Sequence, residues 1–491
     1  MKTRKTILSM ALITALSMTI AACGNGSAPI NTDGISSDDG SVTTAPADGL
    51  SFIPEGTNYN GEEVKIMYAH VLMSDSENEV TYTPDELDGD IISDAVYKRT
   101  TMAEEKLGVK ITSEHLKDYG TLPKVIEQSI MADDNRFDAV VGRLQVMVTA
   151  SSNGHLLNLK NIKTLDLSNQ WWDPNVNDCM DFGGVQNIAS GDINYCDDYS
   201  INVIFFNKKL FEAYGIEEPY QLVRDGTWTF DKLLEMQNDA AVDLNGDGKY
   251  DENDEYGMVS SNLYVVQMLV GFGNKVVIRD NDEVVMNRSQ KIIEQAIEVV
   301  DKAAKRDNNS VIIEERKMGY EKGDALFPNG QTRMYLAPMG QMLKYRQTME
   351  DPFGVLPIPK YDESQDNYYS AVNQYWASCV SVPLNCKDTD RIGYVLETMG
   401  YYSPETVTKA VIEKSIIGKA TRDEETGEML ELIFKSKVFD PGLVYEWGAN
   451  RFWYDIGDAG KSDIIMSRLE KKYDNINARI SESIAGIKSQ Q

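Results

Sequence analysis

The chain has 491 residues, 42% of them hydrophobic, and a formal net charge of −29. This length exceeds what one hydrophobic core supports, so two or three compact domains are expected, and the composition is that of a folded protein rather than a disordered one. A surface this acidic repels phosphate backbones and anionic lipid headgroups, so no nucleic-acid partner is expected.

The first segment, residues 1–22, has three basic residues near its start and then an apolar run too short to span a bilayer. This pattern predicts a secretory signal peptide; the alternative is a short membrane anchor. The string Ile20-Ala21-Ala22-Cys23 is similar to the lipobox of bacterial lipoproteins. That similarity implies lipidation of Cys23, cleavage before it, and a mature chain anchored by lipid at the extracellular face of the cell membrane.

Residues 23–58 are rich in Gly, Ser, Thr, Asp and Pro and show no apolar periodicity. We expect a flexible linker without a fold, which would reach on the order of 30 Å as a coil.

Short apolar runs alternate with helical patterns beyond the linker. Strand, helix, strand and helix at this spacing favour a mainly parallel sheet covered by helices. The predicted strands are 63–68, 109–112 and 137–141, and the predicted helices are 93–107, which stops at Gly108, and 121–132.

The same alternation resumes after residue 200. A strand at 203–206 precedes a helical segment at 207–215, another helix begins at Thr229, and residues 289–306 carry an apolar stripe. A long amphipathic helix is predicted from Ser462, because apolar residues follow at steps of three and four. These residues are Ile465, Leu469, Tyr473, Ile476, Ile480, Ile484 and Ile487.

Four cysteines follow Cys23, namely Cys179, Cys196, Cys379 and Cys386. An exported chain allows two disulfides in three connectivities, but the spacings match no metal-binding pattern and a domain of this size needs no covalent staple. Buried free thiols are the favoured interpretation.

The stretch DLNGDGKYDEND, residues 243–254, matches the spacing of a calcium-binding loop. Ca²⁺ takes six to eight oxygen ligands, and Gly248 permits the sharp turn that the loop needs. An acidic turn without metal is the alternative. The predicted ligands are Asp243, Asn245, Asp247, Lys249 through its carbonyl, Asp251 and Asp254.

Enzyme signatures are missing from the sequence: it has no HExxH, no G-x-S-x-G and no Walker loop, and its three histidines have no metal-pair spacing. Tryptophan and tyrosine residues instead lie next to Gly, Asn and Asp. Aromatic faces that stack on sugar rings, with carboxylates and amides beside them, are typical of a carbohydrate site, although any single tryptophan is expected to pack in the core.

Several segments in order resemble the extracellular solute-binding proteins, family 1 type, of carbohydrate-uptake ABC transporters, the group that includes maltose-binding protein. They include SGDINYCDDYSINVIFFNKKLFEAYGIEEP, DGTWTFDKLLEM, FPNGQTRMYLAPMG and FGVLPIPKYDE, and together the matched segments cover nearly all of residues 60–490. In that family, calcium loops of this kind occur as insertions, which implies a structural role for Ca²⁺ here.

The resemblance implies a two-lobed α/β fold of the periplasmic-binding-protein (Venus flytrap) class with hinge crossovers. The N-terminal lobe is expected to comprise 59–197 and 372–415, and the C-terminal lobe 198–371 and 416–491. It further implies a monomer without enzymatic activity that binds a sugar or oligosaccharide between the lobes and delivers it to the permease subunits of an importer.

The expected ligand-binding residues lie at the crossovers and in one late loop: Asp197, Asp198, Tyr199, Asn373, Tyr375, Trp376 and Trp447. Carboxylates would accept sugar hydroxyl groups and the aromatic rings would stack on the sugar. Two alternatives stay open: a secreted carbohydrate-active enzyme of the glycoside hydrolase kind, and a lipid-anchored ligand sensor.

Overall fold

The structure is a computed structural model of the full chain, and it describes residues 49–69, 82–194, 196–237, 241–280, 283–306, 310–313, 318–411 and 424–489. The predicted signal peptide 1–22 and Cys23 lie outside these ranges. Residues Leu50–Gln491 make up one unit. No helix in the described ranges combines the length and the apolar character needed to cross a membrane.

The first lobe is built on a four-stranded sheet in the order β12-β3-β1-β2. Strand β1 pairs in parallel with both β2 and β3, as the predicted alternation requires, while β12 is antiparallel to β3. The strands are β1 (Glu62–Ala69), β2 (Val109–His115), β3 (Ala139–Arg143) and β12 (Ser378–Ser381). The helices are α1 (Ile91–Leu107), α2 (Leu122–Ala132), α3 (Leu144–Ser152), α4 (Pro174–Met180) and α14 (Thr389–Tyr402).

Helix α1 shows how local sequence sets an element's ends. The carboxylate of Asp90 accepts hydrogen bonds from the backbone N–H groups of Ile92 and Ser93 at 3.0 and 3.1 Å, so the helix starts before the predicted residue 93. The predicted stop is confirmed: Gly108 adopts φ +63°, the left-handed conformation that ends helices. An added Cβ at Gly108 would lie 2.4 Å from the side-chain oxygen of Asn58, so a larger residue would force that side chain to move.

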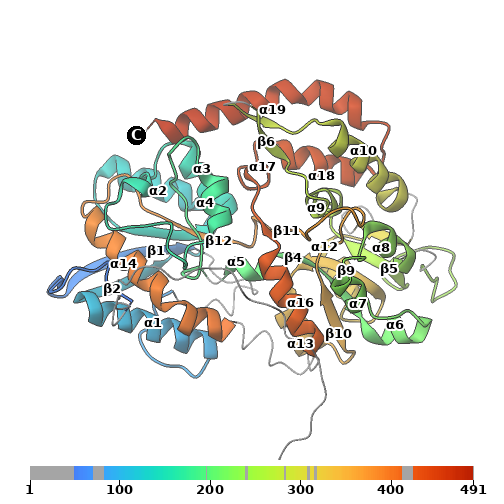
Figure 1. Cartoon of the computed structure of the whole chain (residues 1–491), viewed down its shortest axis with the longest axis horizontal. Helices are drawn as coiled ribbons and strands as arrows, with labels where there is room; N and C mark the ends of the chain where they lie inside the picture. The colour runs from blue at the N-terminus through green and yellow to red at the C-terminus, as the bar shows by residue number, and fades with distance from the viewer. Residues whose placement is uncertain are drawn as a thin grey trace, which may run out of the picture. The chain divides into compact units, whose positions relative to one another are not determined.

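The second lobe is built on a five-stranded sheet in the order β10-β4-β9-β5-β8, in which only β4 runs against its neighbours. The strands are β4 (Asn202–Asn207), β5 (Tyr256–Ser260), β8 (Val311–Ile313), β9 (Thr332–Pro338) and β10 (Phe353–Leu356). Its helices are α6 (Lys208–Tyr214), α7 (Tyr220–Arg224), α8 (Phe230–Gln237), α9 (Tyr264–Gly271), α10 (Gln290–Val299), α12 (Tyr320–Leu326) and α13 (Gln341–Thr348). Figure 1 shows the two sheets with their helices, α1 and α14 beside the first and α6, α7 and α8 beside the second.

Three chain segments run side by side between the two sheets. The short helix α5 (Cys196–Tyr199) leads into β4, and Ile201 pairs with Val372 as an isolated bridge. Strand β11 (Ser370–Ala371), which precedes the return to the first sheet, pairs in parallel with β13 (Lys437–Val438). The predicted boundaries 197/198 and 371/372 fall in these crossovers, whereas 415/416 lies outside the described residues.

The chain after residue 423 contributes to both lobes. Helix α16 (Glu424–Lys435) contacts β10, and α18 (Ala449–Ala459) contacts α9, both in the second lobe. Helix α17 (Pro441–Val444) contacts α3 of the first lobe.

The predicted C-terminal helix is α19, Ile465–Lys488, and it connects the two lobes (Figure 1). Five of the seven predicted apolar positions are buried, while Tyr473 and Ile484 are partly buried. Near its end, the hydroxyls of Ser483 and Ser152 on α3 are 2.7 Å apart. Near its middle, the side-chain oxygen of Asn477 accepts from the backbone N–H of Met286 at the end of β7 (Glu283–Met286). The helix therefore spans from α3 in the first lobe to β7 in the second.

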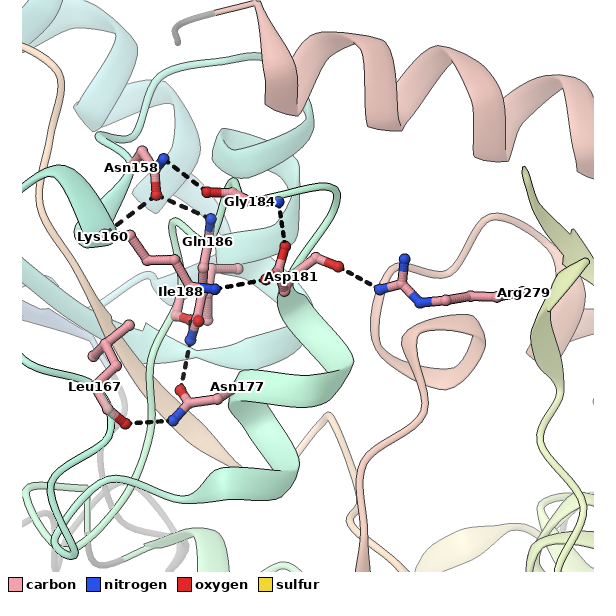
Figure 2. A network of polar contacts seen from close by, with 9 residues as sticks. All are labelled: Asn158, Lys160, Leu167, Asn177, Asp181, Gly184, Gln186, Ile188 and Arg279. Atoms are coloured by element: carbon pink, nitrogen blue, oxygen red, sulfur yellow. Dashed lines mark hydrogen bonds and ion pairs between the residues drawn. The ribbon is translucent and has the colours of Figure 1, made fainter. Parts of the chain in front are cut away.

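A second link between the lobes forms at the loop after α4 (Figure 2). Arg279 in β6 (Val277–Asp280), which pairs with β7, donates to the carbonyl oxygen of Asp181. The carboxylate of Asp181 accepts from Lys160 at 2.5 Å and from the backbone of Gly184 at 2.6 Å, which fixes the loop.

The linker ends earlier than the sequence predicts. Leu50 and Ile53 are only 5% and 7% exposed, and the ring of Phe52 lies 5.8 Å from that of Trp171. Residues 50–58 therefore belong to the folded unit, because three apolar side chains within four residues find a place in the first lobe's core.

Cys179, Cys379 and Cys386 are buried free thiols, as the sequence favours. Burial raises the pKa of all three, so none is a reactive thiolate at neutral pH. The side chain of Cys196 is not among those described.

Candidate functional site

The carboxyl ends of the parallel strands in both sheets face the crossovers. In the first lobe, Ser378 at the start of β12 pairs with Arg143, the last residue of β3. In the second lobe, Asn202 at the start of β4 pairs with Pro338 at the end of β9. The crossovers hold these edges together, since the N–H of Asn373 donates to the carbonyl of Ser200 at 2.8 Å. In open α/β sheets, ligands bind beyond the carboxyl ends of strands, so this region is the candidate site.

Trp376 stands out among the six tryptophans because the other five are buried and it is only partly so. It lies in the crossover just before β12, and its ring contacts Gly340, between β9 and α13. An added Cβ at Gly340 would be 3.0 Å from Cζ3 of Trp376 and 3.3 Å from the carbonyl oxygen of Tyr199. Because Gly340 has no side chain, the indole of Trp376, which belongs to a first-lobe segment, can pack directly against the second lobe.

Tyr375 is also partly buried, and its hydroxyl donates to the carboxylate of Glu446. The side-chain oxygen of Asn373, itself buried, accepts from the N–H of Tyr375 at 3.0 Å and fixes the turn that presents both aromatic residues. Burial, then the neighbouring Tyr454 and Glu446, raise the pKa of Tyr375, so it stays a neutral hydrogen-bond donor. Nothing in the sequence marks Glu446 except its position next to Trp447.

Asp198 lies in a cluster of charged residues. Its carboxylate lies 3.1 Å from Nζ of Lys437 in β13, and the same ammonium lies 2.6 Å from Asp173 at the start of α4. Nearby Asp192 accepts from the hydroxyl of Thr408 at 2.7 Å. Burial raises the pKa of Asp192 to about 6, and the charge of Asp198 adds to the effect.

Tyr199 and Asp197 complete the first crossover. Tyr199 is 3% exposed and its hydroxyl donates to the carbonyl of Val411 at 3.1 Å, so its side chain ties the crossover to the segment after α14. The backbone of Asp197 lies in α5, and its side chain is not among those described.

Trp447 is 4% exposed and packs among aromatic side chains. Its ring stacks on Tyr445, with centroids 4.9 Å apart and planes 15° apart, and both rings meet the edge of Phe182 in the first lobe. The stacking partner of this tryptophan in the structure is therefore a tyrosine of the same loop.

Two arginines that no sequence motif marks also lie at the site. The guanidinium of Arg143 lies 4.2 Å from the ring centroid of Tyr119, and Arg346 of α13 donates to the sulfur of Met342 at 3.3 Å. Burial lowers the pKa of Arg346 to about 10, still far above neutral pH. A strand end and a helix face bring them near the crossovers, and neither position is readable from local sequence.

The predicted calcium loop forms a closed turn between Val242 and Glu255, which pair as an isolated bridge. Its side-chain oxygens bind backbone N–H groups: Asp243 accepts from Gly246 and Gly248 at 2.7 and 2.8 Å, and Asp254 accepts from Leu244 at 3.0 Å. Within the described ranges, no group of three or more His, Cys, Asp or Glu side chains is placed to hold a metal ion. Ca²⁺ binding here stays a prediction.

No protein-family model and no curated protein sequence matches the chain. Solved structures do match. The ABC substrate-binding protein Lmo0181 from Listeria monocytogenes, in complex with cycloalternan, is 16% identical with a TM-score of 0.55, over 86% of this chain and 99% of that one. A cyclo/maltodextrin-binding protein complexed with maltotetraose is 13% identical with a TM-score of 0.53, over 88% and 100%.

A third structure, CpMnBP1 with mannotriose bound, is 16% identical with a TM-score of 0.51, over 86% of this chain and 100% of that one. These likenesses extend over 99–100% of each matched structure and over 86–88% of this chain. The chain has the two-lobed α/β fold of the ABC substrate-binding proteins.

Proposed function

We propose that the chain is the extracellular substrate-binding component of an ABC importer and that it binds an oligosaccharide between its lobes. The observation that carries this proposal is the position of Trp376, the one tryptophan that is not buried, on the crossover where the carboxyl edges of both sheets meet. Shared fold with proteins solved with cycloalternan, maltotetraose and mannotriose supports the same ligand class.

Binding follows from the chemistry of the crossover residues. A sugar ring presents apolar C–H faces and hydroxyl groups. The indole of Trp376 would stack on such a face, while the carboxylate of Glu446 and the side chains around Asp198 would accept hydroxyl hydrogen bonds. A ligand that touches both lobes favours the closed arrangement, because only that arrangement makes both sets of contacts. No covalent step is needed.

Delivery would take place at the membrane. Lipidation of Cys23, as the lipobox-like string implies, would hold the protein at the outer face of the cell membrane, and residues up to 49 would serve as the tether to the folded unit. Mass spectrometry of the N-terminal peptide of the membrane-bound protein should find Cys23 as the first residue, with lipid attached to its sulfur. An unmodified Cys23, or a chain that still begins at Met1, would contradict the anchor.

The loop 243–254 is proposed to bind Ca²⁺ as a structural ion of the second lobe. It lies between α8 and β5, and the side-chain amide of Gln331 donates to the carbonyls of Glu252 and Asp254 at 2.9 and 3.3 Å, which ties the loop to the start of β9. A bound ion would therefore stabilise the lobe rather than contact the sugar.

A thermal-shift screen followed by calorimetry tests the proposal, with maltotetraose, mannotriose and cyclic glucans as ligands and peptides as controls. A ligand that binds only the native state raises the melting temperature. A response to peptides alone would overturn the sugar assignment. Mass spectrometry of the recovered sugar separates binding from the glycoside hydrolase alternative, because a binding protein returns the ligand uncleaved.

A further inference from the structure

Among the described residues with positive φ, Glu446 is the one that is not Gly, Asn or Asp. Four non-glycine residues there have positive φ: Asn60, Asp133, Asn135 and Glu446, the last at +44°. Asn and Asp tolerate the left-handed region because their short polar side chains bond locally, whereas Glu does not share this preference. Strain of this kind persists only where surrounding structure imposes it, and it concentrates at functional sites.

The residues on either side of Glu446 impose this conformation. The stacked rings of Tyr445 and Trp447 pack together against Phe182, and the hydroxyl of Tyr445 lies 3.1 Å from that of Ser151 on α3. Both neighbours are therefore anchored in the first lobe's core. Glu446, between them, is directed away from that core toward Tyr375 and is only partly buried.

The contact with Tyr375 places the carboxylate at the sugar site. Tyr375 precedes Trp376 on the crossover, and its hydroxyl donates to Oε1 of Glu446. Within the part of the chain that the structure describes, Oε2 has no hydrogen-bond partner. An oriented carboxylate with one committed oxygen and one available oxygen is suited to accept a hydroxyl, and it repels a second carboxylate.

The three cationic side chains near the crossovers contact residues other than Glu446. Arg143 lies over the ring of Tyr119, Arg346 donates to Met342, and Lys437 lies between Asp173 and Asp198. The negative charge of Glu446 is thus not paired with a cation by any of these three contacts.

We infer that Glu446 is a specificity-determining residue: held by Tyr375 and by its strained backbone, it selects uncharged saccharides and rejects uronate-containing ones. This inference rests on the proposed function and narrows its ligand class. The residue acts by non-covalent contact alone.

The experiment compares matched neutral and acidic trisaccharides by isothermal titration calorimetry. The probes are mannotriose with trimannuronate, and galactotriose with trigalacturonate, against the wild-type chain and Glu446→Gln. The glutamine is isosteric and still accepts from Tyr375, but it carries no charge. Neutral sugar should bind the variant about tenfold more weakly, since a hydrogen bond to a charged acceptor is lost. The neutral-to-acidic affinity ratio should fall at least about tenfold, because like-charge repulsion is removed.

Stability provides a second readout that a purely structural role would not reproduce. Glu446→Gly removes the strain and the carboxylate together, so it should raise the melting temperature and weaken neutral-sugar binding. The control Asn60→Gly changes a residue at φ +53° in an exposed turn outside the site and should leave binding unchanged.

An unchanged affinity ratio in Glu446→Gln, with sugar binding by the wild type intact, would overturn this inference alone. Equal binding of neutral and acidic sugars by the wild type would do the same. Failure of the wild type to bind any saccharide would overturn the proposed function and this inference with it.

Discussion

Replacing Trp376 with Ala is the most informative single change at the site. The indole is partly exposed and lies against Gly340, so part of its surface is packed on the protein and part remains accessible to a ligand. If a sugar covers about 50 Å² of the roughly 250 Å² that a tryptophan carries, ~25 cal/mol per Å² gives about 1.2 kcal/mol. The expected result is a roughly tenfold weaker Kd for the oligosaccharide.

Calorimetry measures this change, and Trp228→Phe provides a contrast within the same chain. Trp228 is fully buried in the second lobe and its Nε1 donates to the carbonyl of Pro357 at 2.9 Å, so its replacement should cost on the order of 1–3 kcal/mol of stability and leave the Kd of the folded protein within about twofold. An unchanged Kd for Trp376→Ala would remove this residue from the site. A large loss of affinity in Trp228→Phe would show that burial does not distinguish the two tryptophans.

Three further predictions concern stability and are measured by thermal or urea unfolding. Gly486→Ala should destabilise the fold by about 1–3 kcal/mol, because its Cβ would lie 1.9 Å from the carbonyl oxygen of Ser152. The control Gly427→Ala, which has open space around it, should stabilise the fold by up to ~1 kcal/mol. Equal effects of the two substitutions would refute the packing of α19 on α3. Burial raises the pKa of Asp192 from 3.8 to about 6, so the folded chain binds this proton more tightly than the unfolded chain, and the stability that it provides below pH ~4 is lost as the pH rises through about 6. Asp192→Asn should therefore raise the melting temperature at pH ~7.5, with a gain that disappears toward pH ~4, and a gain independent of pH would contradict this ionisation. Chelation of Ca²⁺ should lower the melting temperature and leave sugar affinity intact, while loss of affinity in parallel would place loop 243–254 in the sugar site.

The sequence predicts the elements well where local signals are strong. The strand after Gly108, the helix stop at Gly108 itself and the period of α19 all depend on side chains within one or two turns, and each is confirmed. The parallel sheet follows from the alternation of elements, whereas the expected site at the crossovers follows from the family resemblance and stays a prediction.

The remaining features depend on contacts between distant segments. The sequence draws attention to Trp447 in the late loop, but Phe182, far away along the chain, buries it and leaves its neighbour Glu446 at the crossover. Residues 50–58 have a linker composition, yet Phe52 meets Trp171 and Tyr401, which no local pattern shows. Tertiary packing decides whether an aromatic residue is buried, so an aromatic residue in the sequence does not by itself show whether it belongs to the hydrophobic core or to the binding site.

Titration of the purified chain with neutral oligosaccharides, combined with mass spectrometry of the recovered sugar, distinguishes sugar binding from sugar hydrolysis. We expect saturable binding of at least one of maltotetraose, mannotriose and the cyclic glucans, weakened by Trp376→Ala, with the sugar returned uncleaved. Cleavage of the sugar, or binding that Trp376→Ala and Glu446→Gln both leave unchanged, would contradict this expectation.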